Sequence, residues 1–185
     1  MDRQWLAFAM ENGVPSLTEA SLRGSSLWQY ISDASTQHLY HVILDRVRET
    51  GSPLTLPFRC DGPDRKRFMA LNIRRTEESG LELRSILLRE EATGPIGLLD
   101  AKAPRSGQML RMCSWCKKVE TGDWIEPEQA VKRLNLFHEP VLPCIIHVTC
   151  PGCERELLRQ MNDYICRSSL HPERQQWGNG VWKTV

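Results

Sequence analysis

The sequence predicts an α+β protein: an antiparallel sheet with helices on one face, followed by a small cysteine-rich module. Three observations lead to this expectation. Apolar residues at helical spacing come first, three segments with alternating apolar residues follow, and two C-x-x-C pairs stand in the second half of the 185 residues. A hydrophobic content of 41% and a charged content of 25% are those of an ordinary globular protein.

The helices are expected before residue 52. Two short helical pieces come first, at residues 5–10 and 25–32. A longer helix then begins at a cap formed by Ser35 or Thr36, runs to about Arg48 and is ended by Gly51. Its apolar residues recur at helical spacing: Leu39, Ile43 and Val47.

Three strands are expected next, at residues 54–60, 67–75 and 81–88. Turn-forming residues separate them at 61–64 and at 77–80. Strands joined by such short turns pair in antiparallel fashion.

Composition changes near residue 93, where glycine, proline and small residues replace the periodic pattern. We therefore expect four units: a first domain at 1–92, a linker at 93–108, a cysteine-rich module at 109–168 and a C-terminal tail at 169–185. In the module we expect a helix near 127–134, a strand at 145–148 and a helix from Pro151. That last helix places Leu157, Leu158, Met161 and Ile165 on one side.

The cysteine pairs are the most specific motif of the chain. Cys113 and Cys116 form the first pair, and Cys150 and Cys153 form the second, with 33 residues between the pairs. Zn²⁺ takes four ligands in a tetrahedron, and each C-x-x-C pair can present two thiolates from one tight turn. Because Pro151 suits the first turn of a helix, the second pair opens a helix, as in a treble-clef zinc site. We therefore predict a structural zinc ion bound by these four cysteines.

Alternatives remain for this site. His147 lies three residues before Cys150 and could replace one cysteine or hydrogen-bond to a ligating thiolate. The cysteines could also be buried apolar residues or a redox pair. Of the remaining cysteines, Cys60 is expected in the core, and Cys144 and Cys166 have no paired spacing.

Charge and hydropathy exclude several classes of protein. The net charge is only +1, which argues against a nucleic-acid-binding protein even though candidate contact residues exist. These candidates are Lys117, Lys118, Lys132, Arg133, Trp177, Trp182 and Lys183. No apolar run approaches the length of a membrane span, and the first residues do not read as a signal peptide, so we expect a cytoplasmic protein. We find no catalytic motif and predict no enzyme.

The first half resembles the PAS-like sensory domains of bacterial signalling proteins. The residues that carry this resemblance lie in four stretches, at residues 5–13, 24–31, 39–48 and 58–63. PAS domains begin with two strands ahead of the first helix, whereas only four residues precede Trp5 here. We therefore expect those strands to be missing and one sheet edge to be open. A start placed too late, a partner chain or the C-terminal module could account for this edge.

The second half is similar to a cysteine-rich segment often attached to bacterial PAS and response-regulator proteins. The matching stretches are residues 112–118, 123–126 and 147–153. The resemblance implies that the four cysteines bind a metal. It leads to the hypothesis of a non-enzymatic sensory or protein-interaction module that signals through a protein partner or by self-association.

A haem- or redox-sensing PAS protein is the alternative function. PAS-like pockets can hold haem, and Cys150-Pro151 is a Cys-Pro dipeptide of the type seen in haem-responsive proteins. His38 or His41 could supply an axial ligand to the haem iron. However, both histidines fall on the face of their helix opposite its apolar residues, which favours solvent exposure.

Overall fold

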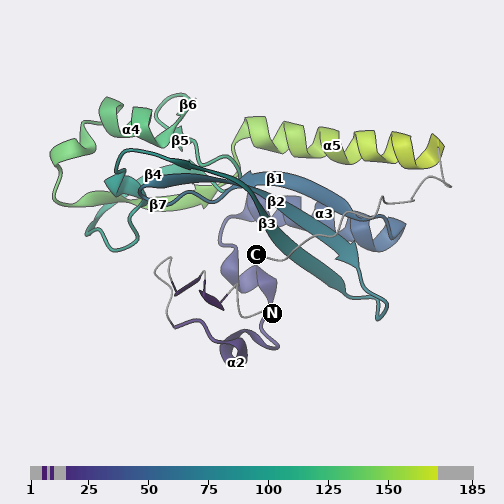
Figure 1. The fold of residues 1–185 in the computed structure, drawn as a ribbon. Coiled ribbons are helices and arrows are strands. Elements are labelled where there is room, and N and C mark those ends of the chain that lie inside the picture. Colours follow the sequence, from purple (N-terminus) through teal and green to yellow (C-terminus); the bar gives the residue numbers. More distant parts are fainter. Residues whose placement is uncertain (1–5, 8, 11–15, 171–185) are drawn as a thin grey trace.

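The computed structural model describes residues 6–7, 9–10 and 16–170 (Figure 1). Side chains are described up to Met161. It confirms an α+β architecture with an antiparallel sheet. A three-stranded sheet has the order β1-β2-β3, and a four-stranded sheet has the order β6-β5-β4-β7. Among the described residues, none of the helices combines the length and apolarity that a membrane span requires.

The long helix α3, Ala34–Thr50, covers one face of the first sheet. Asp33 is its N-cap, because its carboxylate accepts hydrogen bonds from the backbone N–H and the hydroxyl of Thr36. The predicted cap at Ser35 or Thr36 is therefore wrong, since both residues lie inside the helix. Gly51 ends the helix in the left-handed conformation, with a φ of 66°, as its position predicts.

The first sheet consists of β1, Leu54–Arg59, β2, Arg65–Arg75, and β3, Leu81–Ala92. All three strands pair in antiparallel fashion, with Leu54 opposite Ile73 and Leu56 opposite Leu71. These four residues are buried, so alternation along β1 and β2 brings one apolar face onto the core. Strands β2 and β3 extend two and four residues beyond the predicted bounds of 67 and 88.

The segments before α3 are shorter than predicted. They contain α2, Glu19–Leu22, which the sequence analysis missed, and the 3₁₀-helix η1, Leu27–Tyr30, which replaces the helix expected at 25–32. Of the helix expected at 5–10, residues 6, 7, 9 and 10 are helical, and residues 5 and 8 lie outside the described residues.

The second half contains more strands than predicted. Its elements are η2 (Gly97–Leu99), β4 (Arg105–Cys113), β5 (Val119–Glu120), β6 (Trp124–Ile125), α4 (Pro127–Arg133), η3 (Leu136–His138), β7 (Leu142–Val148) and α5 (Pro151–Leu170). Strand β4 begins inside the range predicted as a linker and pairs in parallel with β7. Helices α4 and α5 begin where the sequence predicts them. The boundaries of the four expected units stay a prediction.

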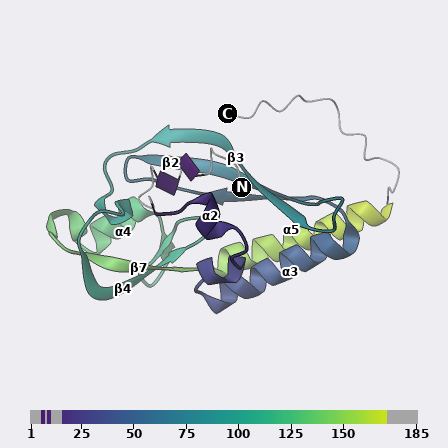
Figure 2. The ribbon, with the colours of Figure 1, turned by 90° about the horizontal axis from the view of Figure 1, so that it is seen from below.

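One hydrophobic cluster joins the two halves of the chain. It contains buried residues of α3, β1 and β2 together with Cys113, Trp115, Cys150, Leu157 and Met161 of the second half. Figure 2 shows α3 and α5 running alongside each other, in agreement with their shared cluster. A smaller second cluster lies between the second sheet and α4, and consists of Ile96, Leu98, Met112, Val119, Ala130 and Val131.

Candidate metal centre

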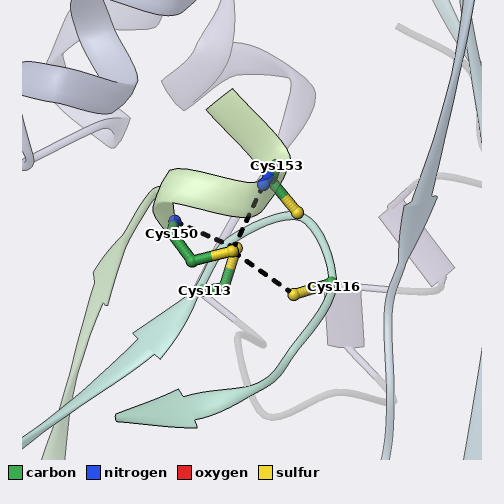
Figure 3. A group of neighbouring side chains, drawn as sticks. All are labelled: Cys113, Cys116, Cys150 and Cys153. Carbon is green, nitrogen blue, oxygen red and sulfur yellow. Dashed lines mark hydrogen bonds between the residues drawn. The ribbon is translucent and has the colours of Figure 1, made fainter. Parts of the chain in front are cut away.

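The parallel pairing of β4 and β7 brings the two cysteine pairs together. Cys113 ends β4 and lies opposite Val148, the last residue of β7. The chain turns after Cys113 to place Cys116, and it turns after Val148 to place Cys150 and Cys153 at the start of α5. Two segments distant in sequence therefore meet at the same end of two neighbouring strands, and their cysteines lie together in Figure 3.

The four cysteines form a compact group of sulfur atoms, called here the cysteine cluster. The Sγ atoms of Cys113, Cys116, Cys150 and Cys153 all lie within 4.8 Å of one another. The Sγ atoms of Cys116 and Cys150 are 3.8 Å apart, far longer than a disulfide bond. A tetrahedron with zinc–sulfur bonds of about 2.3 Å has sulfur–sulfur edges of roughly 3.8 Å. The cluster therefore has the dimensions of a four-thiolate metal site.

The turn that carries the first pair is fixed by backbone hydrogen bonds. The N–H of Cys113 donates to the carbonyl of Lys118 at 2.8 Å, and the N–H of Lys117 donates to the carbonyl of Cys113 at 3.1 Å. Lys117 adopts a left-handed conformation with a φ of 62°, which reverses the chain within one tight turn. The side-chain nitrogen of Lys117 donates to the carbonyl of Ser114 at 3.1 Å, and burial lowers the pKa of Lys117.

Backbone N–H groups also point at the sulfurs. The N–H of Cys150 donates to Sγ of Cys113, and the N–H of Cys153 donates to Sγ of Cys150, both at 3.4 Å. Pro151 is the first residue of α5, so the second pair lies at the positive end of a 20-residue helix. These donors and the helix dipole favour the thiolate form that a metal requires.

Three of the thiols, those of Cys113, Cys116 and Cys153, influence one another's ionisation. Hydrogen bonding with Cys113 raises the pKa of Cys116 to about 12. Hydrogen bonding with Cys113, and to a smaller extent with Cys116, also raises the pKa of Cys153. Hydrogen bonding with Cys116 and Cys153 lowers the pKa of Cys113. Hydrogen bonds between the thiols cause this separation of pKa values, and burial further raises the pKa values of Cys116 and Cys153. A divalent cation bound by the sulfurs would favour the thiolate form of its ligands.

The cluster is packed against the first half of the chain. Trp115 is buried inside the cysteine turn, and its ring stacks on Tyr40 of α3 with centroids 5.6 Å apart. The N–H of Arg59, at the end of β1, donates to the carbonyl of Trp115 at 2.7 Å. Burial raises the pKa of Tyr40, so its phenol stays neutral.

A chain of hydroxyl groups links the second cysteine pair to the start of α3. Thr149, which precedes Cys150, lies 2.9 Å from the hydroxyl of Thr36, and both residues are buried. The hydroxyl of Thr36 donates to the carboxylate of Asp33 at 2.8 Å. Since that proton is committed to Asp33, Thr149 donates to Thr36.

His147 is not part of the cysteine cluster. It lies on β7 in the wall of a cleft of about 470 Å³ that Met112, Lys117 and Ile145 also line. Desolvation, with the charge of Lys117 second, lowers the pKa of His147 to about 4, so the imidazole is neutral near pH 7. Its predicted alternative role as a ligand stays untested.

The other candidate residues lie apart from the cluster. Cys60 lines the same cleft, the thiol of Cys144 donates to the carbonyl of Ser106 at 3.2 Å, and the side chain of Cys166 lies outside those described. His38 and His41 are exposed on α3, and the ring of His41 stacks on Trp28 at 3.8 Å. Of the residues considered for nucleic-acid binding, Trp177, Trp182 and Lys183 lie outside the described residues.

Sequence reasoning missed a group of charged side chains that joins the two sheets. Arg59 of β1 contacts Asp61 and, at 2.7 Å, Glu126 at the start of α4. Lys66 of β2 contacts Glu126 at 3.4 Å and Glu128 at 2.7 Å. The side chains of Arg59 and Asp61 are 11% and 1% exposed, whereas those of Lys66, Glu126 and Glu128 are partly exposed, so the group is buried at one end only. Nothing in the local sequence marks it, because its members come from segments about 60 residues apart.

Comparison with known proteins does not place the chain in a family. No family model, no curated protein and no solved structure matches it. The geometry of the cysteine cluster is therefore the main guide to what this protein binds.

Proposed function

We propose that the cysteine cluster binds one structural zinc ion, and that the chain is a non-enzymatic sensory or protein-interaction module of a bacterial signalling system. The observation that carries the first part is the sulfur geometry, with four Sγ atoms within 4.8 Å of one another and one pair 3.8 Å apart. Tetrahedral all-sulfur sites are typical of zinc and of iron.

A structural role fits the coordination set better than a catalytic role. Catalytic zinc sites keep one position open for water or substrate, whereas four cysteines occupy all four positions of a tetrahedron. Cys113 and Cys150 are 0% and 4% exposed, and Cys116 and Cys153 are half-buried, which limits the access of a substrate to the sulfurs. A cysteine turn joined to a pair at a helix N-terminus supports a treble-clef arrangement.

The sensory role rests on the resemblance of the first half to PAS-like domains. An antiparallel sheet with one face against a long helix supports that assignment. The cluster contacts this helix through Trp115 and Thr149, so metal binding and the position of α3 are physically connected. An interaction module of this kind passes its state to a partner by contact.

Metal analysis of the full chain, purified without chelator, tests the proposal. We expect one zinc per chain, retained by Cys144→Ser and lost in Cys116→Ser and Cys153→Ser. Cobalt substitution should give the visible absorption of tetrahedral thiolate coordination. An absorbance scan of the same sample tests the haem alternative, because a Soret band would replace the zinc hypothesis with haem sensing. Folded protein without stoichiometric metal would refute the proposal.

A further inference from the structure

The outer edge of β3 is an uncovered strand edge within the described residues. β3 is the last strand of the first sheet and pairs with β2 alone, through Leu81 to Ala92. No strand of the second half pairs with β1 or β3 in the described part of the chain. A strand of 12 residues with one free edge carries a row of unpaired backbone N–H and C=O groups.

Apolar side chains accompany this free edge. Leu83, Leu87 and Leu88 are 39%, 52% and 62% exposed. Leu83 lies opposite Ile73 and Leu87 lies opposite Met69, so both leucines continue the core-facing side of the sheet. The apolar face of the first sheet therefore continues onto β3, where Leu83 and Leu87 are exposed to solvent. Exposed leucines on a long free edge are a feature that monomeric proteins avoid.

The charges of β3 are complementary to those of a second, antiparallel copy of the same strand. A two-fold axis through Leu87 places two copies of β3 side by side in antiparallel orientation, with Leu87 of one copy opposite Leu87 of the other. Leu88 is the extra residue of a bulge, since Met69 pairs with Leu87 and Phe68 with Arg89. Counted past this bulge, Arg84 would lie opposite Glu91 of the second copy, on the same face of the sheet. Within its own strand, Glu91 contacts Arg89 at 3.0 Å.

Arg84 is available for such a pair. Its neighbour Glu82 is already bound to Arg74, and Arg84 forms no ion pair of its own among the described residues. A shift of the axis by one residue, to Ile86, would instead set Arg84 against Arg89 of the partner subunit. Since like charges directly opposite each other destabilise a sheet, the charges favour the register centred on Leu87 over the register centred on Ile86.

We propose that β3 pairs with β3 of a second copy, so that two three-stranded sheets form one continuous six-stranded sheet with Leu87 at its centre. The ladder supplies main-chain hydrogen bonds, the leucines supply apolar contact, and the two Arg84–Glu91 pairs fix the register. This inference rests on the proposed interaction function and names its partner as a second copy of the chain.

Sedimentation of the full chain over a roughly hundredfold concentration range tests the interface. We expect a reversible species of twice the 21.3 kDa chain mass. Leu87→Lys should weaken dimerisation at least about tenfold. Phe137→Lys, at a residue that is 57% exposed on η3, is the matched control and should dimerise like the unchanged chain.

Charge exchange tests the register. Arg84→Glu should weaken the dimer about fivefold, and Arg84→Glu combined with Glu91→Arg should restore it. A chain that stays monomeric at every concentration would overturn the interface, as would equal effects of Leu87→Lys and Phe137→Lys. Zinc content measured in the same samples separates the two proposals: a monomer with one zinc per chain refutes the interface alone, whereas folded, metal-free protein refutes the proposed function.

Discussion

The two sheets of this protein are held together in different ways. The first sheet has strands of 6, 11 and 12 residues and buries one apolar face against α3. The second sheet includes two strands of only two residues each, and its end near α5 is gathered around four sulfur atoms. The first region can be stabilised by apolar burial alone. In the second region the ladder is long only between β4 and β7, and a metal bound by the four cysteines would add a cross-link at the end of that ladder.

Removal of a cysteine ligand should have the largest effect of the changes that test this difference. Cys150→Ser should abolish metal binding and unfold the second sheet, because structural zinc contributes on the order of 10 kcal/mol or more of apparent folding free energy. Hydrogen exchange should show loss of protection in β4 and β7 and partial retention in β2. Cys144→Ser is the control and should keep both metal and protection. Protection of β7 that survives Cys150→Ser would show that the second region does not depend on the metal.

A cavity in the core of the first region should lower the stability of the chain and leave its metal content unchanged. Ile43 is 0% exposed on α3, and Ile43→Ala should lower the free energy of unfolding by about 3 kcal/mol. Zinc should stay at one per chain, because the four cysteines are carried by the end of β4, the turn after it and the start of α5 rather than by α3. Leu158→Ala, at a residue that is 39% exposed on α5, should have a much smaller effect in the same denaturant titration. Metal loss in Ile43→Ala would contradict the view that apolar burial stabilises the first region and metal binding the second.

The ion-pair group at the seam between the sheets should respond to pH. Desolvation opposes ionisation of Glu126, but hydrogen bonds and charge from Arg59 and Lys66 outweigh it and lower the pKa of this carboxyl. A carboxyl whose pKa is lower in the folded chain stabilises it above the unfolded pKa, and loses this effect as pH falls through the folded pKa.

Glu126→Gln should therefore cost about 1–2 kcal/mol near neutral pH and almost nothing in acid, measured as the difference between two unfolding titrations. The exposed Glu49→Gln is the control and should leave the unfolding free energy unchanged at both pH values. A cost for Glu126→Gln that is independent of pH would exclude the charge as its cause.

The hydroxyl link between the second cysteine pair and α3 should give the smallest effect. Thr149→Val leaves Thr36 without its donor and should cost about 1 kcal/mol. Thr36→Val also removes a bond to Asp33, and the double variant should cost less than the sum of the two single variants. Additive costs in this double-mutant cycle would show that the two hydroxyl groups do not interact.

The difference between the regions also decides what could be predicted from sequence. Alternation in β1 and β2 and helical spacing at Leu39, Ile43 and Val47 lie within short windows, so the elements of the first sheet were found there. The C-x-x-C pairs identified the cysteines that the structure brings together, because two such pairs have few other structural uses.

The features that could not be predicted from the sequence depend on contacts between distant segments. Strands β5 and β6 are too short to carry a period, and β4 begins among small residues that otherwise indicate a linker. The cap was misplaced by two or three residues, because Asp33 competes with two neighbouring hydroxyl residues for the same role. The parallel pairing of β4 with β7 and the Arg59 ion-pair group arise only in the folded chain.

X-ray absorption at the zinc edge of the purified full chain tests the metal centre most directly. Coordination by the cysteine cluster predicts one shell of four sulfur atoms at about 2.3 Å, with no nitrogen or oxygen ligand. A shell of three sulfur atoms and one nitrogen would replace one cysteine with a histidine such as His147. Absence of bound metal from folded protein would contradict the metal centre altogether.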